Sequence, residues 1–126
     1  MLFRSVRMAE GSARLAPATT IHELAVLLHA ASLCVGSDTG PVHLAAALGV
    51  PSVGLYGPMP AERNGLYGAH CISLQEMQVS GSSRQRRQAS SEAMEAIAVE
   101  QVCAACAQLL KREPPSRPAA DGGPER

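Results

Sequence analysis

The sequence has few aromatic residues and no excess of charge of either sign. It contains no Trp, one Phe and two Tyr, and its 11 Lys and Arg residues balance its 11 Asp and Glu residues. Proteins that bind single-stranded nucleic acid stack bases on aromatic side chains in a basic groove, so we expect no nucleic-acid partner. Because 46% of the residues are hydrophobic, a fully disordered chain is also excluded.

Long apolar runs are also absent. The first residues, MLFRSVRMAEGSARLAP, carry scattered charges where a secretory signal needs a continuous apolar segment, and Ser37 and Asp38 split the longest candidate for a membrane helix. We therefore expect a cytoplasmic chain with no transmembrane segment. The four cysteines are too dispersed for a disulfide scaffold. Cys103 and Cys106 have CxxC spacing without a second pair, which favours two apolar residues on one helix face over zinc ligands.

With 126 residues the chain is long enough for one modest domain. Apolar residues at helical spacing, with Thr20 and Glu23 in a capping-box pattern, predict a helix from residue 20 to about 31. A buried strand is expected at 33–36, a second helix from Pro41 to about Gly49, and a second strand at 52–56. This alternation predicts an α/β fold, with parallel strands and flanking helices.

A third strand is expected at 71–74, and the polar stretch at 78–91 is interpreted as a loop or a disordered insertion. The run from Arg84 to Arg87 could touch an anionic lipid surface, which would give a peripheral position at the inner membrane, but a solvated loop is favoured. A last helix is expected at 99–112. Its inward residues would be Val102, Cys103, Cys106, Leu109 and Leu110. Residues 1–15 are expected to be irregular, residues 16–112 to form the domain, and residues 113–126 to be a disordered tail.

The stretch Ser37–Gly40 interrupts the apolar pattern between a strand and a helix. In an open α/β sheet, ligands bind at the carboxyl ends of the strands, and a helix N-terminus there offers N–H donors to a phosphate. Gly40 lets the backbone come close to an anion, Pro41 has no N–H, and the Thr39 hydroxyl can cap the helix or bind a ligand oxygen. Asp38 is unfavourable beside a phosphate but suits the hydroxyls of a sugar.

His43 falls in the first turn of the same helix, where a ring N–H could reach a phosphate oxygen. Together these residues indicate a site for a sugar attached to a phosphate. The alternative is that Asp38 or Thr39 only caps the helix and that His43 is a partly buried surface residue.

Three longer strings carry a family resemblance. TTIHELAVLL at 19–28, VGSDTGPVHLAAALG at 35–49, and GLYGP at 54–58 with RNGLYG at 63–68 resemble, in order and spacing, the bacterial ADP-heptose:lipopolysaccharide heptosyltransferases of glycosyltransferase family 9. The resemblance runs from about residue 19 to 68, and more loosely to residue 110. It implies a GT-B glycosyltransferase, in which two Rossmann-like domains face each other across a cleft. This chain is similar to part of the C-terminal, donor-binding domain.

On this resemblance, Asp38 would hold hydroxyls of the donor heptose, Thr39 and Gly40 would hold the diphosphate, and His43 would support the same diphosphate. Gly57 and Pro58 would help to wall the nucleotide cleft. Ser37 and Arg63 are further cleft candidates, although a surface position is an equal alternative for Arg63. No paired acidic metal site is present in this stretch, so we expect no metal and no cofactor.

In the family, the catalytic base and the acceptor site lie in an N-terminal domain that has no counterpart here, so no catalytic residue is assigned in this chain. The resemblance therefore implies a glycosyltransferase fragment that binds a nucleotide-diphosphate sugar such as ADP-heptose. The lipopolysaccharide core acceptor would bind through the missing domain, and the fragment is expected to be inactive alone. Two alternatives stay open: a non-catalytic nucleotide- or phosphate-binding module, and a truncated fragment too unstable to fold.

Overall fold

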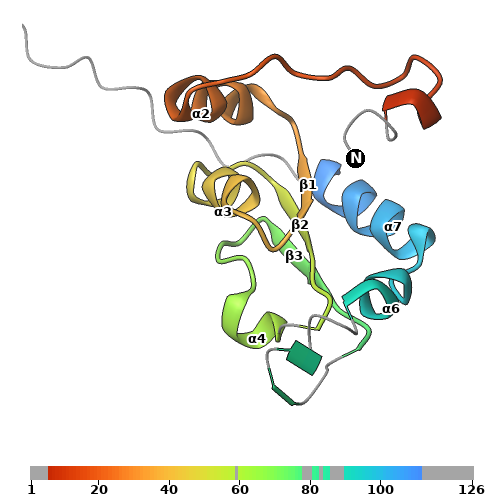
Figure 1. Cartoon of the computed structure of the whole chain (residues 1–126). Coiled ribbons are helices and arrows are strands. Elements are labelled where there is room, and N and C mark those ends of the chain that lie inside the picture. Colours follow the sequence, from red (N-terminus) through yellow and green to blue (C-terminus); the bar gives the residue numbers. More distant parts are fainter. Residues whose placement is uncertain (1–5, 59, 78–80, 83, 86–89, 112–126) are drawn as a thin grey trace, which may run out of the picture.

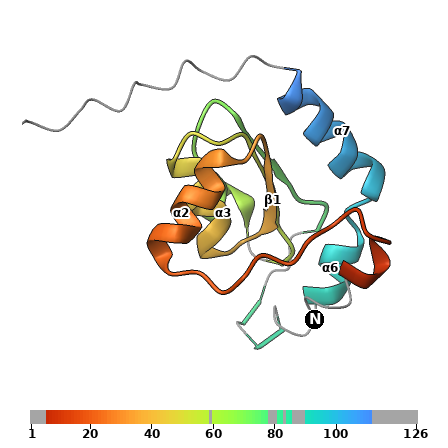
Figure 2. The ribbon, with the colours of Figure 1, turned by 90° about the horizontal axis from the view of Figure 1, so that it is seen from above.

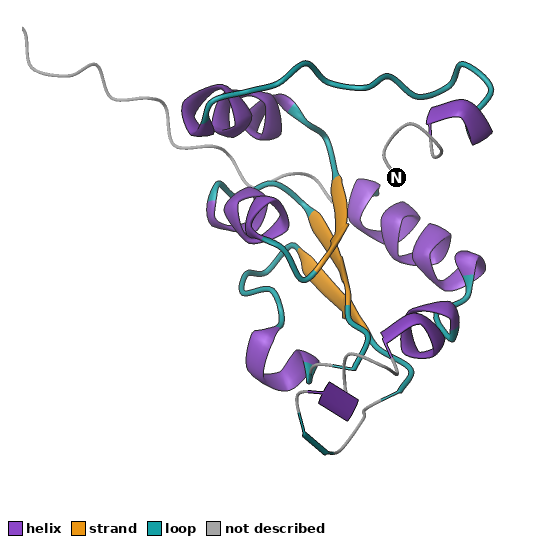
Figure 3. Ribbon diagram, in the orientation of Figure 1, coloured by secondary structure: helices purple, strands orange, loops and turns teal. Residues whose placement is uncertain are grey.

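The computed structural model describes residues 6–58, 60–77, 81–82, 84–85 and 90–111. Its centre is a parallel sheet of three strands, β1 (Cys34–Ser37), β2 (Ser52–Leu55) and β3 (Cys71–Leu74), in the order β1-β2-β3 (Figures 1 and 3). The expected α/β fold is confirmed, and so are the three strands, with β1 beginning and ending one residue later than the pattern indicates.

The strand register places β-branched residues together in one row of the sheet and two glycines together in the next. Val35 pairs with Val53 and Val53 with Ile72, while Gly36 pairs with Gly54. Since side chains alternate along a strand, the valine row and the glycine row face opposite sides of the sheet. The glycine row lies beneath the helix that follows β1, where a Cβ on Gly36 would lie 3.5 Å from the Val42 side chain. This helix can therefore pack close to the sheet.

Two helices lie on the glycine side of the sheet. The first, α2 (Ile21–Ala30), begins with the expected capping box: the Glu23 N–H donates to Thr20 Oγ1 and the Thr20 N–H donates to Glu23 Oε2. The second, α3 (Gly40–Ala47), packs on β1 and β2, and α2 packs on α3 (Figure 2). Gly49, with φ +75°, ends this segment where predicted.

The predicted last helix is present as α7 (Val99–Leu110), and it lies on the opposite side of the sheet. Its Ala105 and Leu109 pack with Val53 into a buried cluster. Two residues expected to point inward do not: Cys103 is exposed, and Leu110 is 57% exposed. Each lies about 100° or more around the helix from the buried Ala105 and Leu109, the residues through which α7 packs on the sheet.

Some helical segments fall where none was expected. A four-residue helix, α4 (Ala61–Asn64), follows β2, and α6 (Ser90–Glu95) begins within the stretch interpreted as a loop. Residues 84 and 85 are helical as well, after a capping pattern in which the Ser82 N–H donates to Gln85 Oε1. The loop interpretation was therefore wrong for part of 78–91. A short helical turn at 6–8 lies in the segment expected to be irregular. The predicted tail at 113–126 lies outside the described residues.

Candidate functional site

The predicted site lies at the carboxyl end of β1, in the loop that leads into α3. Ser37 is the last residue of β1, Asp38 and Thr39 form the turn, and Gly40 is the first residue of α3; all four are exposed. Thr39 occupies the N-cap position, but its hydroxyl makes no capping bond and donates instead to the Ser37 carbonyl at 3.2 Å. The helix N-terminus is therefore not closed by its own N-cap side chain.

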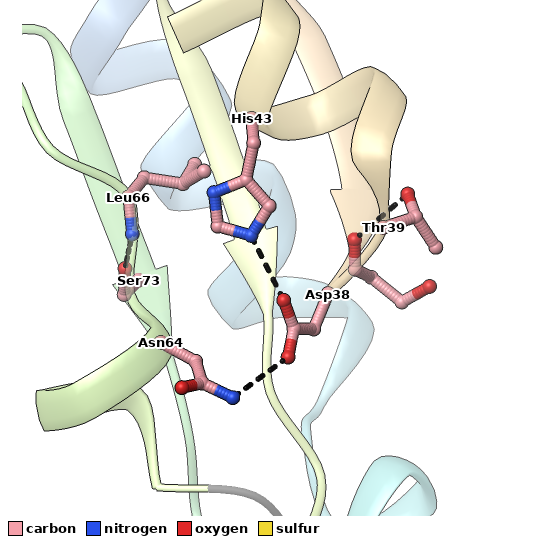
Figure 4. A network of polar contacts seen from close by, with 7 residues as sticks. Asp38, Thr39, His43, Asn64, Leu66 and Ser73 are labelled. Carbon is pink, nitrogen blue, oxygen red and sulfur yellow. Dashed lines mark hydrogen bonds and ion pairs between the residues drawn. The ribbon is translucent and has the colours of Figure 1, made fainter.

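Asp38 is the centre of a polar network that draws on three elements (Figure 4). Its Oδ1 lies 2.8 Å from Nε2 of His43, in the first turn of α3, and its Oδ2 accepts a hydrogen bond of 3.3 Å from Nδ2 of Asn64, at the end of α4. The side chains of Asp38 and His43 are 31% and 40% exposed. The carboxylate is thus held on two sides and still open to solvent.

The other cleft candidates lie nearby in the fold but outside this network. Gly57 is buried, and its carbonyl accepts a hydrogen bond of 2.7 Å from Gln75 Nε2, beyond the end of β3. Pro58 is half-buried. Arg63 is exposed on α4, next to Asn64. Sequence reasoning chose Arg63 and missed Asn64, although both stand in the same RNG string; only the packing of α4 against the β1 loop distinguishes them.

Tyr56 follows β2 and is the largest fully buried side chain among the described residues. Its ring folds back over Gly54, where an added Cβ would lie 2.7 Å from Cε2 of the ring. Burial, and then the negative charge of Asp38, raise the pKa of Tyr56, so the phenol stays neutral. The absence of a side chain at Gly54 therefore provides the space that the buried ring of Tyr56 occupies.

The network offers a carboxylate as hydrogen-bond acceptor beside the N–H donors of a helix N-terminus. The described residues contain no group of three or more His, Cys, Asp or Glu side chains that could hold a metal ion.

A groove of about 550 Å³ lies between residues 17–19 and α2, and none of its lining residues belongs to the Asp38 network. Within the described part of the chain, none of the helices has the length and apolarity to cross a bilayer.

Solved structures share this fold. A glycosyltransferase family 9 protein from Veillonella parvula matches with a TM-score of 0.67 and 29% identity, over 85% of this chain and 33% of that one. The E. coli heptosyltransferase WaaC, solved with ADP, matches with a TM-score of 0.52 and 36% identity, over 56% of this chain and 23% of that one. Both matches therefore cover only a part of the longer protein.

Sequence comparisons point the same way. Lipopolysaccharide heptosyltransferase 1 from Pseudomonas aeruginosa is 40% identical over 73 residues, and its counterpart from Campylobacter coli is 37% identical over 57. The matched regions make up 21% and 17% of those proteins. The sequence model of glycosyltransferase family 9 (heptosyltransferase) matches residues 3–96, which includes most of the segment before α2. With this match over most of its length, the chain belongs to glycosyltransferase family 9, the heptosyltransferase family.

Proposed function

We propose that this chain is the donor-binding part of a heptosyltransferase-like enzyme and holds a nucleotide-diphosphate sugar such as ADP-heptose. The observation that carries the proposal is the position of Asp38, held by His43 and Asn64 directly beside the open N-terminus of α3. A sugar has hydroxyls for the carboxylate, and a diphosphate has oxygens for the helix donors. The E. coli relative was solved with ADP, which agrees with a nucleotide ligand for this fold.

The diphosphate would lie over the first turn of α3. The first N–H groups of a helix have no partner within it, and because Pro41 has none, Gly40 and Val42 are the donors of this turn. Apart from Gly40 itself, its two chain neighbours and the backbone of its own helix, no atom lies within 4 Å of the position that a Cβ on Gly40 would occupy, which leaves room for a phosphate. The helix dipole adds partial positive charge at the same point.

His43 would serve both ligand groups through its two ring nitrogens. Its Nε2 already faces Asp38, so Nδ1 is the atom left for a phosphate oxygen. A protonated ring donates from both nitrogens at once, and would join the carboxylate to the diphosphate.

In the complete reaction, a hydroxyl of the lipopolysaccharide core would attack the anomeric carbon with inversion as the nucleotide diphosphate leaves. The helix donors would stabilise the charge that develops on the leaving phosphate. The acceptor site and the base that takes the hydroxyl proton are assigned to a second domain of a GT-B enzyme, so we expect no turnover by this chain alone. A cytoplasmic location, with a peripheral position at the inner membrane as an option, is part of this proposal.

The direct test is thermal unfolding of the purified chain with and without ADP-heptose. A ligand that binds only the folded state stabilises it, by about 2.7 kcal/mol at a concentration one hundred times its Kd. We expect a cooperative transition that ADP-heptose raises more than ADP does. The Asp38→Ala variant should lose this preference for the sugar nucleotide and keep ADP binding. Glu95→Ala, which removes an exposed carboxylate from α6, is the control.

The alternatives predict other results. Equal shifts with ADP and ADP-heptose would contradict the role of Asp38 and favour a general nucleotide- or phosphate-binding module. The absence of any cooperative transition would favour a fragment that does not fold by itself. Turnover by the purified chain, given donor and acceptor, would refute the expected inactivity.

A further inference from the structure

Asn64 reaches Asp38 from a different element than His43 does. Asn64 and Asp38 are 26 positions apart in the sequence, yet Asn64 Nδ2 lies 3.3 Å from Oδ2 of Asp38. On the other oxygen, His43 Nε2 lies 2.8 Å from Oδ1 of Asp38 (Figure 4). Each carboxylate oxygen of Asp38 therefore has one side-chain neighbour able to donate a hydrogen bond. A carboxylate contacted on one oxygen alone can still turn about its Cβ–Cγ bond, whereas contacts on both oxygens fix its plane.

Hydrogen bonds connect the segment around α4, the helix that carries Asn64, to β3 and to Gln75 directly after it. The Ala61 N–H donates to Gln75 Oε1 at 3.0 Å, and the same Gln75 side chain donates to the Gly57 carbonyl. Just beyond the C-terminal end of the helix, the Leu66 N–H donates to Ser73 Oγ at 3.3 Å. Because α4 has only four residues, these bonds to the sheet, more than its own turn, determine where Asn64 lies.

Gly65 allows the tight closure of this helix. Its N–H donates to the Ala61 carbonyl at 2.7 Å, and a Cβ at this position would collide with that carbonyl oxygen. The chain can therefore turn back toward β3 directly after Asn64 only if a glycine follows. The RNG string thus combines a side chain aimed at Asp38 with the turn that keeps it there.

The fixed carboxylate retains capacity to bind a ligand. An ionised carboxylate has about four lone-pair positions, and His43 and Asn64 occupy two of them. The side chain is 31% exposed, so the remaining positions are open to solvent. Two hydroxyls on neighbouring carbons of a sugar match a carboxylate whose plane does not turn, because both hydrogen bonds then form without further ordering of the acceptor.

We propose that Asn64 is a positioning residue that fixes the Asp38 carboxylate for the sugar of the donor, and so sets the preference for a sugar nucleotide over the nucleotide alone. The inference rests on the proposed function, because it assumes that Asp38 binds the sugar. Asn64 itself acts through Asp38 and makes no contact with the diphosphate.

The test is calorimetric titration of the full chain with ADP-heptose and with ADP. Asn64→Ala should weaken ADP-heptose binding by about threefold to tenfold and leave ADP binding unchanged, because only the sugar contact depends on Asp38. Asn64→Asp should weaken ADP-heptose binding further, since a second carboxylate would repel the carboxylate of Asp38. Glu62→Ala, an exposed change on the same helix, should alter neither affinity. The thermal midpoint of each variant shows whether the fold is intact.

The ratio of the two affinities separates positioning from general damage. A variant that merely loosens the fold would lose affinity for both nucleotides, and such a parallel loss would overturn the inference. The inference would also be overturned if Asn64→Ala keeps the wild-type ratio of ADP-heptose to ADP affinity while Asp38→Ala abolishes the preference. If the wild-type chain binds both nucleotides equally, or neither, the proposed function fails and the inference fails with it.

Discussion

The two glycines at the ends of α3 serve different purposes. Gly49 has a φ of +75°, a region that costs an L-residue about 1–2 kcal/mol, so its role is conformational. Gly40 has no such backbone constraint, and the position of its missing Cβ is in open space. The fold therefore does not explain a glycine at position 40, whereas a phosphate lying against the helix N-terminus would.

This difference predicts opposite effects of two alanine substitutions. Gly40→Ala should leave the free energy of unfolding unchanged and weaken ADP binding roughly tenfold, the equivalent of about 1.4 kcal/mol. Gly49→Ala should lower the free energy of unfolding by about 1–2 kcal/mol and leave ADP affinity intact. Urea unfolding and calorimetric titration measure the two quantities. Unchanged ADP affinity in Gly40→Ala would argue against a diphosphate at this helix.

At the scale of elements, a capping box stabilises the start of α2, a helix with little burial. None of the residues of α2 is buried, and Ile21 and Val26 are 66% and 71% exposed. The bonds between Thr20 and Glu23 satisfy the first N–H groups of the helix. They also lower the pKa of Glu23, which means that the folded state favours the ionised carboxylate.

Removing the cap should therefore give a pH-dependent loss of stability. Thr20→Ala should lower the free energy of unfolding by about 1 kcal/mol near neutral pH. Because the pKa of Glu23 is lowered on folding, its contribution is present above its unfolded-state pKa and disappears as the pH falls through the folded value. The difference between variant and wild type should shrink in acid, as followed by urea unfolding. Thr19→Ala, an exposed change that leaves the cap, is the control, and an equal loss there would contradict the role of Thr20.

At the scale of the whole molecule, α7 closes one face of the sheet by a single stripe of side chains. Leu109 is 1% exposed and packs with Val53 and Ala105, while the adjacent Leu110 is 57% exposed. The stability of the described domain thus depends on a small number of buried contacts. Domains of this size are marginally stable, at about 5–15 kcal/mol, so one such contact is a large share of the total.

The neighbouring leucines provide a matched pair. Leu109→Ala should lower the free energy of unfolding by about 2–5 kcal/mol, because it removes buried methyl groups and leaves a cavity. Leu110→Ala should change it by about 0.5 kcal/mol or less. Urea unfolding of both variants measures the difference. Similar losses for the two substitutions would mean that α7 does not pack on the sheet through the stripe described here.

The sequence by itself determined the elements whose signals are local. Thr20 and Glu23 identify the start of α2, Pro41 and Gly49 bracket α3, and short apolar runs identify all three strands. The family was predicted from the sequence strings between residues 19 and 68, and the match of the family's sequence model to residues 3–96 confirms it. These features were predictable because capping, glycine conformation and hydrophobic period act between residues a few positions apart.

Only the tertiary structure decided which side chains meet across the sheet. The contact of Asn64 with Asp38, the ring of Tyr56 over Gly54, and the choice of Leu109 over Leu110 as the buried leucine all depend on how separate elements pack. A four-residue helix such as α4 is not predictable from its own sequence, because its bonds to Gln75 beyond β3 hold it. Contacts between distant residues depend on the register of the strands and the width of the sheet, which no local pattern encodes.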